Sequence, residues 1–162
     1  MQQDTVKECV ELLCRLVSTP SVSGSEDGTA DILYAFLAER GAEVNRLHNN
    51  VWAKATGFDS AKPTLLLNSH HDTVKPAGGY TFDPYAGRVE GDKILGLGSN
   101  DAGGSLVSLI ALFSHYSDTT ALPFNLILAL TAEEETMGER GMRAMLAHLA
   151  DEGIKVDMAL VG

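Results

Sequence analysis

Histidine and carboxylate side chains gather in three short segments of the sequence, two of which follow apolar stretches. His70 and Asp72 come at the end of one stretch, Glu134 and Glu135 follow another, and Asp101 lies in a glycine-rich segment. In open α/β sheets, ligands bind outside the carboxyl ends of the strands. We therefore expect these side chains to meet and to form a carboxylate-rich metal site.

The residue types favour a hydrolytic metal centre. Ligands from His70, Asp101 and Glu135 would be nitrogen and carboxylate oxygen, which suit Zn²⁺, with Co²⁺ or Mn²⁺ as alternatives. A histidine that binds a metal usually donates its other ring N–H to a carboxylate, and Asp72 is placed for this role. Glu134 could take a proton from water at the metal, since Zn²⁺ lowers the pKa of that water toward about 7.

Each segment has a simpler interpretation when it is taken alone. His70 could be a core histidine, and three consecutive glutamates could begin a solvated helix. The glycine-rich segment fails as a dinucleotide-binding loop, because Asp101 stands where a glycine is needed and would repel pyrophosphate. The three segments together, in this order, favour the metal site. His71 points to the other side of its strand by alternation, so we give it no metal role.

The three segments resemble the signature pieces of the M20 family of co-catalytic metallopeptidases and deacylases. They read Ser-His-His-Asp-Thr-Val at 69–74, Gly-Leu-Gly-Ser-Asn-Asp-Ala-Gly-Gly at 96–104 and Thr-Ala-Glu-Glu-Glu-Thr at 131–136. The last two are most similar to the acetylornithine deacetylase branch. One departure is Glu133, where the family usually has Asp, and we expect it to have little consequence.

The resemblance implies a role for each position. His70 would bind one metal ion, Asp101 would bridge two, and Glu135 would bind the other. Asp72 would orient the histidine, and Glu134 would be the general base.

The implied activity is that of a zinc-dependent amidohydrolase of amino-acid and arginine biosynthesis. It would remove the acyl group from an N-acyl amino acid, which is a small-molecule substrate, and Co²⁺ could replace Zn²⁺. A dipeptidase or carboxypeptidase that uses the same site is one alternative, and a non-catalytic structural fragment is another. The resemblance also implies a cis peptide bond between Asp101 and Ala102.

Family members are considerably longer than 162 residues. Their remaining ligands are an acidic residue just after a Val-Gly pair, such as Val161-Gly162, and a histidine near the far C-terminus. We therefore expect residues 1–162 to be the N-terminal part of a catalytic domain, without the lid or dimerisation domain and without the C-terminal part. This chain should bind zinc weakly or not at all and be inactive, whereas the full-length protein would hold two Zn²⁺ and could be a homodimer.

Composition limits the other classes of protein. Hydrophobic residues make up 44% and charged residues 21%, which is typical of a globular domain. A net charge of −10 argues against nucleic acid as a partner, and no apolar run approaches the roughly 20 residues of a membrane span. The N-terminus has no features of a signal peptide. Cys9 and Cys14 lie on different faces of a predicted helix, so two free thiols indicate the cytoplasm.

Hydrophobic periodicity predicts strands that alternate with helices. Such alternation indicates an α/β fold, here an α/β/α sandwich with a largely parallel sheet. The resemblance makes this sandwich part of a zinc-peptidase-like catalytic domain. The expected helices cover about 5–19, 26–40, 101–116 and 139–151. The expected strands cover about 43–47, 51–56, 64–69, 87–90, 94–95, 124–130 and 158–161.

Overall fold

A five-stranded sheet forms the centre of the computed structural model, which describes residues 3–119 and 121–162. The strand order is β1-β2-β6-β3-β7. Strands β6, β3 and β7 are parallel, whereas β1 and β2 form an antiparallel hairpin at the β6 edge. The α/β prediction is confirmed, with this hairpin as the antiparallel part of the sheet. The bounds are β1 Val44–Leu47, β2 Asn50–Lys54, β3 Thr64–His70, β6 Asn125–Thr131 and β7 Met158–Val161.

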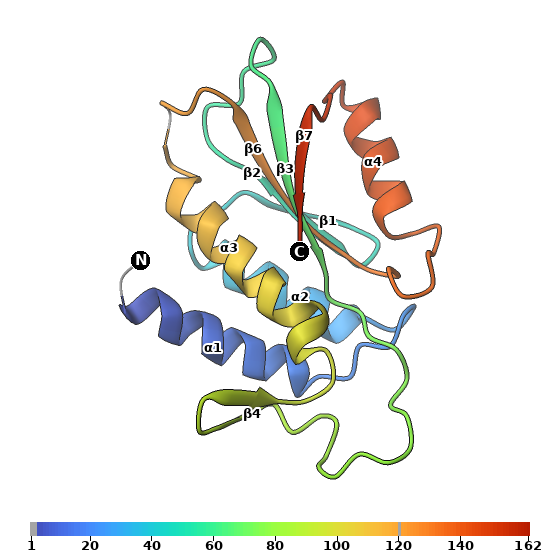
Figure 1. Cartoon of the computed structure of the whole chain (residues 1–162). Helices are drawn as coiled ribbons and strands as arrows, with labels where there is room; N and C mark the ends of the chain where they lie inside the picture. The colour runs from blue at the N-terminus through green and yellow to red at the C-terminus, as the bar shows by residue number, and fades with distance from the viewer. Residues whose placement is uncertain (1–2, 120) are drawn as a thin grey trace.

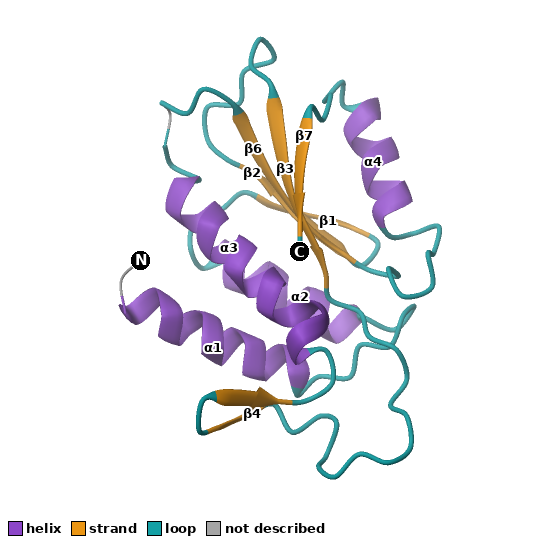
Figure 2. Cartoon of the chain, viewed as in Figure 1, coloured by secondary structure: helices purple, strands orange, loops and turns teal. Residues whose placement is uncertain are grey.

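Helices cover both faces of the sheet (Figures 1 and 2). Helices α1, α2 and α3 pack on one face and bury the larger apolar core. Helix α4 packs on the other face over a smaller core. The described residues contain no helix with the length and apolar character needed to cross a membrane. The bounds are α1 Gln3–Val17, α2 Asp27–Ala38, α3 Gly104–Tyr116 and α4 Met142–Asp151.

The two central strands are buried almost throughout, which explains the apolar runs 65–67 and 126–130 within them. Every residue of β6 is buried, and so is all of β3 except Leu65. A strand of a parallel sheet that is covered on both faces reads as a continuous apolar run rather than an alternating one. The strands pair in register, with His70 opposite Thr131, so both end at the same edge of the sheet.

The connections that leave β3 and β6 run to opposite faces. The chain after β3 continues to α3 on one face, and the chain after β6 continues to α4 on the other (Figure 1). Right-handed crossovers in opposite directions require this arrangement. A crevice therefore opens between the two strand ends, and such a crevice is where open α/β sheets bind their ligands.

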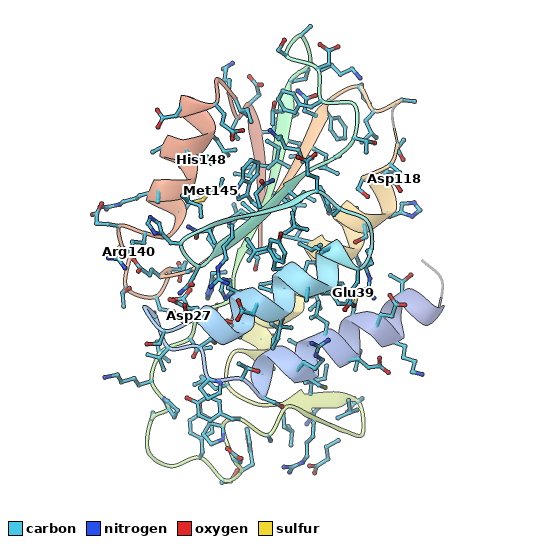
Figure 3. All side chains as sticks on the ribbon, turned by 180° about the vertical axis from the view of Figure 1, so that it is seen from behind. Asp27, Glu39, Asp118, Arg140, Met145 and His148 are labelled. Carbon is cyan, nitrogen blue, oxygen red and sulfur yellow. The ribbon has the colours of Figure 1, made fainter. Side chains whose placement is uncertain are left out.

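Helix α4 is fixed by aromatic and apolar contacts with the sheet. Met145 is fully buried, and the ring of His148 lies 5.3 Å from that of Trp52 in an edge-to-face arrangement. Figure 3 shows Met145 and His148 on the side of α4 that faces the sheet. Trp52 is itself buried in this smaller core.

Two helices begin later than expected. The expected helix at 101 is preceded by a wide turn, η1 (Ser99–Gly103), whose Asp101 has the non-helical angles φ −114° and ψ 99°. The Asp101–Ala102 peptide is cis, as the resemblance implied. Helix α4 begins at Met142 rather than 139, because the residues after β6 form a loop that is held by side chains from elsewhere. A small hairpin of β4 (Arg88–Glu90) and β5 (Lys93–Leu95) precedes η1.

Candidate metal centre

Three potential metal ligands converge at the edge of the sheet where β3 and β6 end, beside η1. His70, Asp101 and Glu135 each offer one ligand atom, and these atoms all lie within 4.8 Å of one another. His70 is the last residue of β3, Asp101 lies in η1, and Glu135 lies in the loop after β6. One imidazole nitrogen and two carboxylate oxygens fit a borderline divalent metal such as zinc. The structure thus brings together the ligand residues that the sequence predicts.

His70 has its two ring nitrogens in different surroundings. Nδ1 lies 3.1 Å from the backbone oxygen of Asp72 and 3.3 Å from its Oδ1. Nε2 faces the ligand cluster, 3.1 Å from Asp101 Oδ1 and 3.8 Å from Glu134 Oε2. Burial disfavours the charged ring, but hydrogen bonds to Asp72 and Asp101 and the charges of Asp72 and Glu134 outweigh it and raise the pKa of His70 to about 9. Nε2 is therefore the nitrogen available to a metal.

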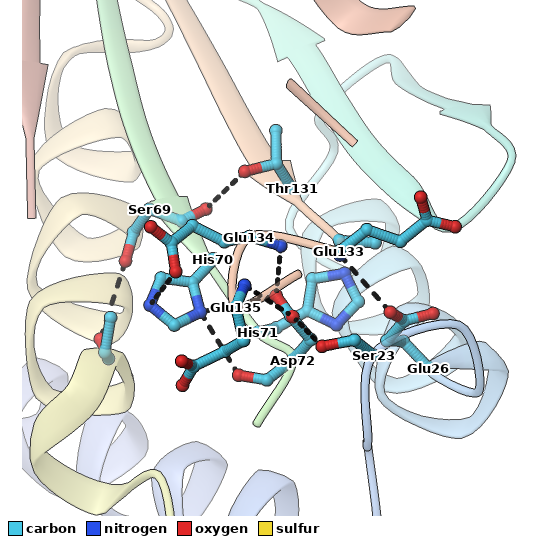
Figure 4. Close-up of polar contacts among 12 residues, drawn as sticks. Ser23, Glu26, Ser69, His70, His71, Asp72, Thr131, Glu133, Glu134 and Glu135 are labelled. Carbon is cyan, nitrogen blue, oxygen red and sulfur yellow. Dashed lines mark hydrogen bonds and ion pairs between the residues drawn. The ribbon is translucent and has the colours of Figure 1, made fainter. Parts of the chain in front are cut away.

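Asp72 is a buried acceptor with several donors. Its Oδ2 accepts a hydrogen bond from Ser23 Oγ at 2.6 Å, and its two oxygens also accept the backbone N–H groups of Glu134 and Glu135 (Figure 4). Burial alone would raise the pKa of Asp72. These donors and His70 prevail and lower it to about 2. Asp72 is therefore an ionised anchor for His70 and for the loop after β6.

The two glutamates after β6 differ in their surroundings. The side chain of Glu134 is 58% exposed. Glu135 is half-buried, and burial followed by the negative charge of Asp101 raises its pKa. Crowded carboxylates of this kind are relieved by a cation. The exposed Glu134 can instead exchange protons with a substrate or with water.

An open cleft of about 420 Å³ lies beside the ligand cluster. This size falls within the range of small-molecule sites. Gly162 also lines the cleft, and its N–H donates to the backbone oxygen of Asn68 at 3.0 Å. The cleft is lined by Asn68, Ser69, His70, Asn100, Asp101, Ala102, Ser105, Glu134, Val161 and Gly162.

His71 points away from the cluster, as strand alternation predicts. Its ring is buried between Thr29 Oγ1, at 2.8 Å from Nδ1, and the backbone oxygen of Asn49, at 3.0 Å from Nε2. Burial lowers the pKa of His71, so it remains neutral and structural.

Sequence reasoning missed the buried polar residues behind the site. Glu26 and Asn50 are completely buried, and each accepts a backbone N–H from the loop after β6. Ser23 donates to Asp72 from a segment that reads as a plain polar loop. In the sequence, Glu26 appears as an acidic residue at the start of a helix, and Asn50 appears as part of an Asn-Asn pair in a turn. Both patterns are usually explained by the local structure alone.

Comparisons with known proteins agree on the family. The sequence profile of Peptidase family M20/M25/M40 matches residues 66–162. A succinyl-diaminopimelate desuccinylase from Dinoroseobacter shibae is 31% identical over 159 residues, which cover 94% of this chain and 42% of the relative. Another from Delftia acidovorans is 26% identical over 164 residues, with the same two coverages.

Solved structures of the same family share the fold. A metallo-carboxypeptidase of the M20 family from Sulfolobus solfataricus has a TM-score of 0.72 at 24% identity, over 99% of this chain and 37% of that one. A dinuclear metal binding peptidase of the M20 family from Bacillus subtilis has a TM-score of 0.68 at 16% identity, over 96% and 42%.

The site and the fold define a hydrolase-like α/β domain with a candidate metal centre at the carboxyl edge of its sheet. The chain belongs to peptidase family M20/M25/M40. It spans about 42% of the length of the curated relatives that it matches. Both of these relatives are named desuccinylases, whereas the sequences of the segments 96–104 and 131–136 favoured the acetylornithine deacetylase branch.

Proposed function

We propose that this chain is the N-terminal part of the catalytic domain of a metal-dependent amidohydrolase that removes the acyl group from an N-acyl amino acid. The observation that carries the proposal is the convergence of ligand atoms from His70, Asp101 and Glu135 within 4.8 Å beside an open cleft. Membership of the M20 family supports it.

The residues divide the chemistry among them. Two divalent metals, one held by His70, the other by Glu135 and both by Asp101, would supply Lewis acidity toward the amide carbonyl and toward water. Glu134 is exposed, so its carboxylate can take the proton of the attacking water and pass it to the leaving amine. Asp72 holds the Nδ1 side of His70, which leaves Nε2 free for the metal.

The full-length protein would supply the remaining ligands and the lid or dimerisation domain. Three protein ligands shared between two metals fall short of the three or four that each zinc takes. A residue that followed Gly162 would start beside the cleft, because Gly162 lines it. Binding of two Zn²⁺ or Co²⁺, a homodimer and a cytoplasmic location belong to this same proposal.

The acyl group is either acetyl or succinyl. The motif wording favours acetyl, on ornithine, and the names of two relatives favour succinyl. The test is hydrolysis of a panel of N-acetyl and N-succinyl amino acids by the full-length protein with Zn²⁺ or Co²⁺. Turnover that is lost with a chelator supports an amidohydrolase. No turnover of any acyl amino acid would contradict it.

A dipeptidase or carboxypeptidase is the second candidate, because the structural neighbour from Sulfolobus solfataricus is a metallo-carboxypeptidase. Dipeptides in the same panel distinguish the two activities, since both would use the same metal centre but differ in the acyl side of the scissile amide, which is an acetyl or succinyl group in one and an aminoacyl group in the other. A protein that turns over neither class although it is fully loaded with metal would be a non-catalytic structural fragment.

A further inference from the structure

The backbone of the loop after β6 is hydrogen-bonded to buried side chains from three other segments. Four consecutive backbone N–H groups, those of residues 132–135, each donate to such a side chain, and Figure 4 shows the contacts of Glu26 and Asp72. The donor and acceptor pairs are Ala132 N to Asn50 Oδ1 at 3.0 Å, Glu133 N to Glu26 Oε1 at 3.2 Å, Glu134 N to Asp72 Oδ1 at 3.0 Å and Glu135 N to Asp72 Oδ2 at 3.2 Å.

Glu26 is the acceptor in this set that needs an explanation. Its side chain is completely buried, and no ion pair to it occurs within residues 3–119 and 121–162. Its donors are neutral: Oε1 also accepts Gly24 N at 2.5 Å, and Oε2 accepts Asn49 Nδ2 at 3.0 Å. A buried carboxylate is costly unless it is fully hydrogen-bonded. The buried carboxylate of Glu26 is therefore stabilised by hydrogen bonds from three neutral donors.

Capping of α2 does not account for Glu26. An acidic residue before a helix usually accepts a hydrogen bond from the first turn. Glu26 precedes α2, yet its side chain makes no capping bond to that helix. The carboxylate turns instead toward Glu133, 107 residues away in the sequence.

The chain changes direction at Glu133, the residue whose N–H contacts Glu26. It has a φ of 56°, which is uncommon for a residue other than glycine. Its backbone oxygen accepts Gly138 N at 2.9 Å, and its Oε2 accepts Arg140 N at 3.1 Å. The next two residues then face Asp72 and His70. Glu133 is thus the pivot of the loop that carries the proposed base.

We propose that Glu26 is a positioning residue for the hydrolytic reaction: by holding the backbone N–H of Glu133 it sets the position of the Glu134 carboxylate. This inference rests on the proposed role of Glu134 as the general base. Glutamine cannot replace Glu26 without loss. Its NH₂ group would face an N–H donor on either side, and Asn49 cannot flip freely because its Oδ1 accepts Arg46 Nη2 at 2.7 Å.

The contact itself can be tested in this chain without any activity. Amide hydrogen exchange at Glu133 should become about 10- to 100-fold faster in Glu26→Gln, because a hydrogen bond to a charged group is lost. The matched control is Glu139→Gln, an exposed glutamate that pairs with Arg143, and it should leave Glu133 unchanged. Equal exchange in wild type and Glu26→Gln would overturn the proposal.

A measurement on the unmutated chain covers the case in which Glu26→Gln does not fold. Scalar coupling across the hydrogen bond, from the amide nitrogen of Glu133 to the carboxylate carbon of Glu26, should be detectable by NMR. Its absence, in spectra that show the corresponding coupling from Glu134 to Asp72, would overturn the proposal.

A double-mutant cycle in the full-length protein separates positioning from general stability. Glu26→Gln should lower kcat about 10- to 100-fold at full metal loading, with KM changed by less than about threefold. In a Glu134→Gln background the same substitution should change kcat by less than about twofold, because the base that it positions is gone. Equal losses in both backgrounds would overturn the proposal. If Glu134→Gln alone has no effect, the proposed function fails, and the NMR results still decide whether Glu26 holds the loop.

Discussion

The carboxylate of Asp72 accepts the backbone N–H of Glu134 at 3.0 Å through Oδ1. The same oxygen lies 3.3 Å from His70 Nδ1. One buried side chain therefore fixes both the histidine that ends β3 and the start of the glutamate pair after β6. Asp72 therefore couples the proposed ligand to the proposed base across the parallel pair of β3 and β6.

Removal of the charge on Asp72 should weaken metal binding. We expect Asp72→Asn to lower the zinc affinity of the full-length protein about 10- to 100-fold, which is the usual effect of losing the partner of a metal-binding histidine. Asp92→Asn, in the exposed turn between β4 and β5, is the matched control. Competition with a zinc-binding dye measures the zinc affinity of both variants and of the wild type. Equal zinc affinities of the wild type and Asp72→Asn would contradict the orienting role of Asp72.

The two adjacent glutamates should separate into different phenotypes. Glu134→Gln should lower kcat at least about 100-fold and leave the metal content intact, because only proton transfer is lost. Glu135→Gln should lose metal, because a ligand is removed. Metal analysis alongside steady-state kinetics gives both results, and near-wild-type turnover by Glu134→Gln would refute the assigned base.

The pair of His70 and Asp72 predicts how the stability of this chain depends on pH when a chelator is present. The pKa of His70 is about 9 in the folded chain, against its ordinary value of 6.5. The charged ring therefore stabilises the fold fully below pH 6.5, and this contribution is lost as pH rises through about 9. Asp72, with a pKa of about 2 against 3.8, stabilises the fold above pH 3.8 and loses this effect as pH falls toward 2.

NMR titration of the histidine rings measures the alkaline limb of this dependence. His70 should titrate with a midpoint near 9, and the midpoint should fall in Asp72→Asn. A His70 midpoint at or below its ordinary value would show that the carboxylates do not act on the ring.

The ligand cluster could be predicted from sequence because its members are tied to strand ends. The apolar runs that become β3 and β6 mark where each strand stops, and parallel strands end at a common edge. The position of Asp101 was also expected, although the helix was expected to begin there. Residues 99–103 instead form a wide turn, because Asp101 and Ala102 have non-helical angles that apolar periodicity does not encode.

The supports of the site could not be predicted from sequence. Glu26 and Asn50 contact the loop after β6 across 107 and 82 residues. Their sequence neighbours indicate only ordinary local roles, for Glu26 at the start of a helix and for Asn50 in a turn. Only the packed sheet reveals that they are buried acceptors, because burial of a polar side chain depends on tertiary contacts.

The 162-residue chain should bind zinc poorly by itself. Three protein ligands cannot complete two zinc sites, and Asp101, Glu134 and Glu135 crowd their negative charges. Calorimetric titration of this chain with Zn²⁺ should therefore show weak binding or none, with no deacylase activity. Two stoichiometric sites of about nanomolar affinity together with turnover would show that no further ligands are needed.

The most direct test of the account is the location of zinc in crystals of the full-length protein by anomalous diffraction at the zinc edge. The account predicts two peaks on either side of Asp101, one at about 2.0–2.1 Å from His70 Nε2 and the other at about 2.0–2.2 Å from a carboxylate oxygen of Glu135. Zinc bound elsewhere in a protein that still hydrolyses N-acyl amino acids, with His70 and Glu135 free of metal, would contradict it.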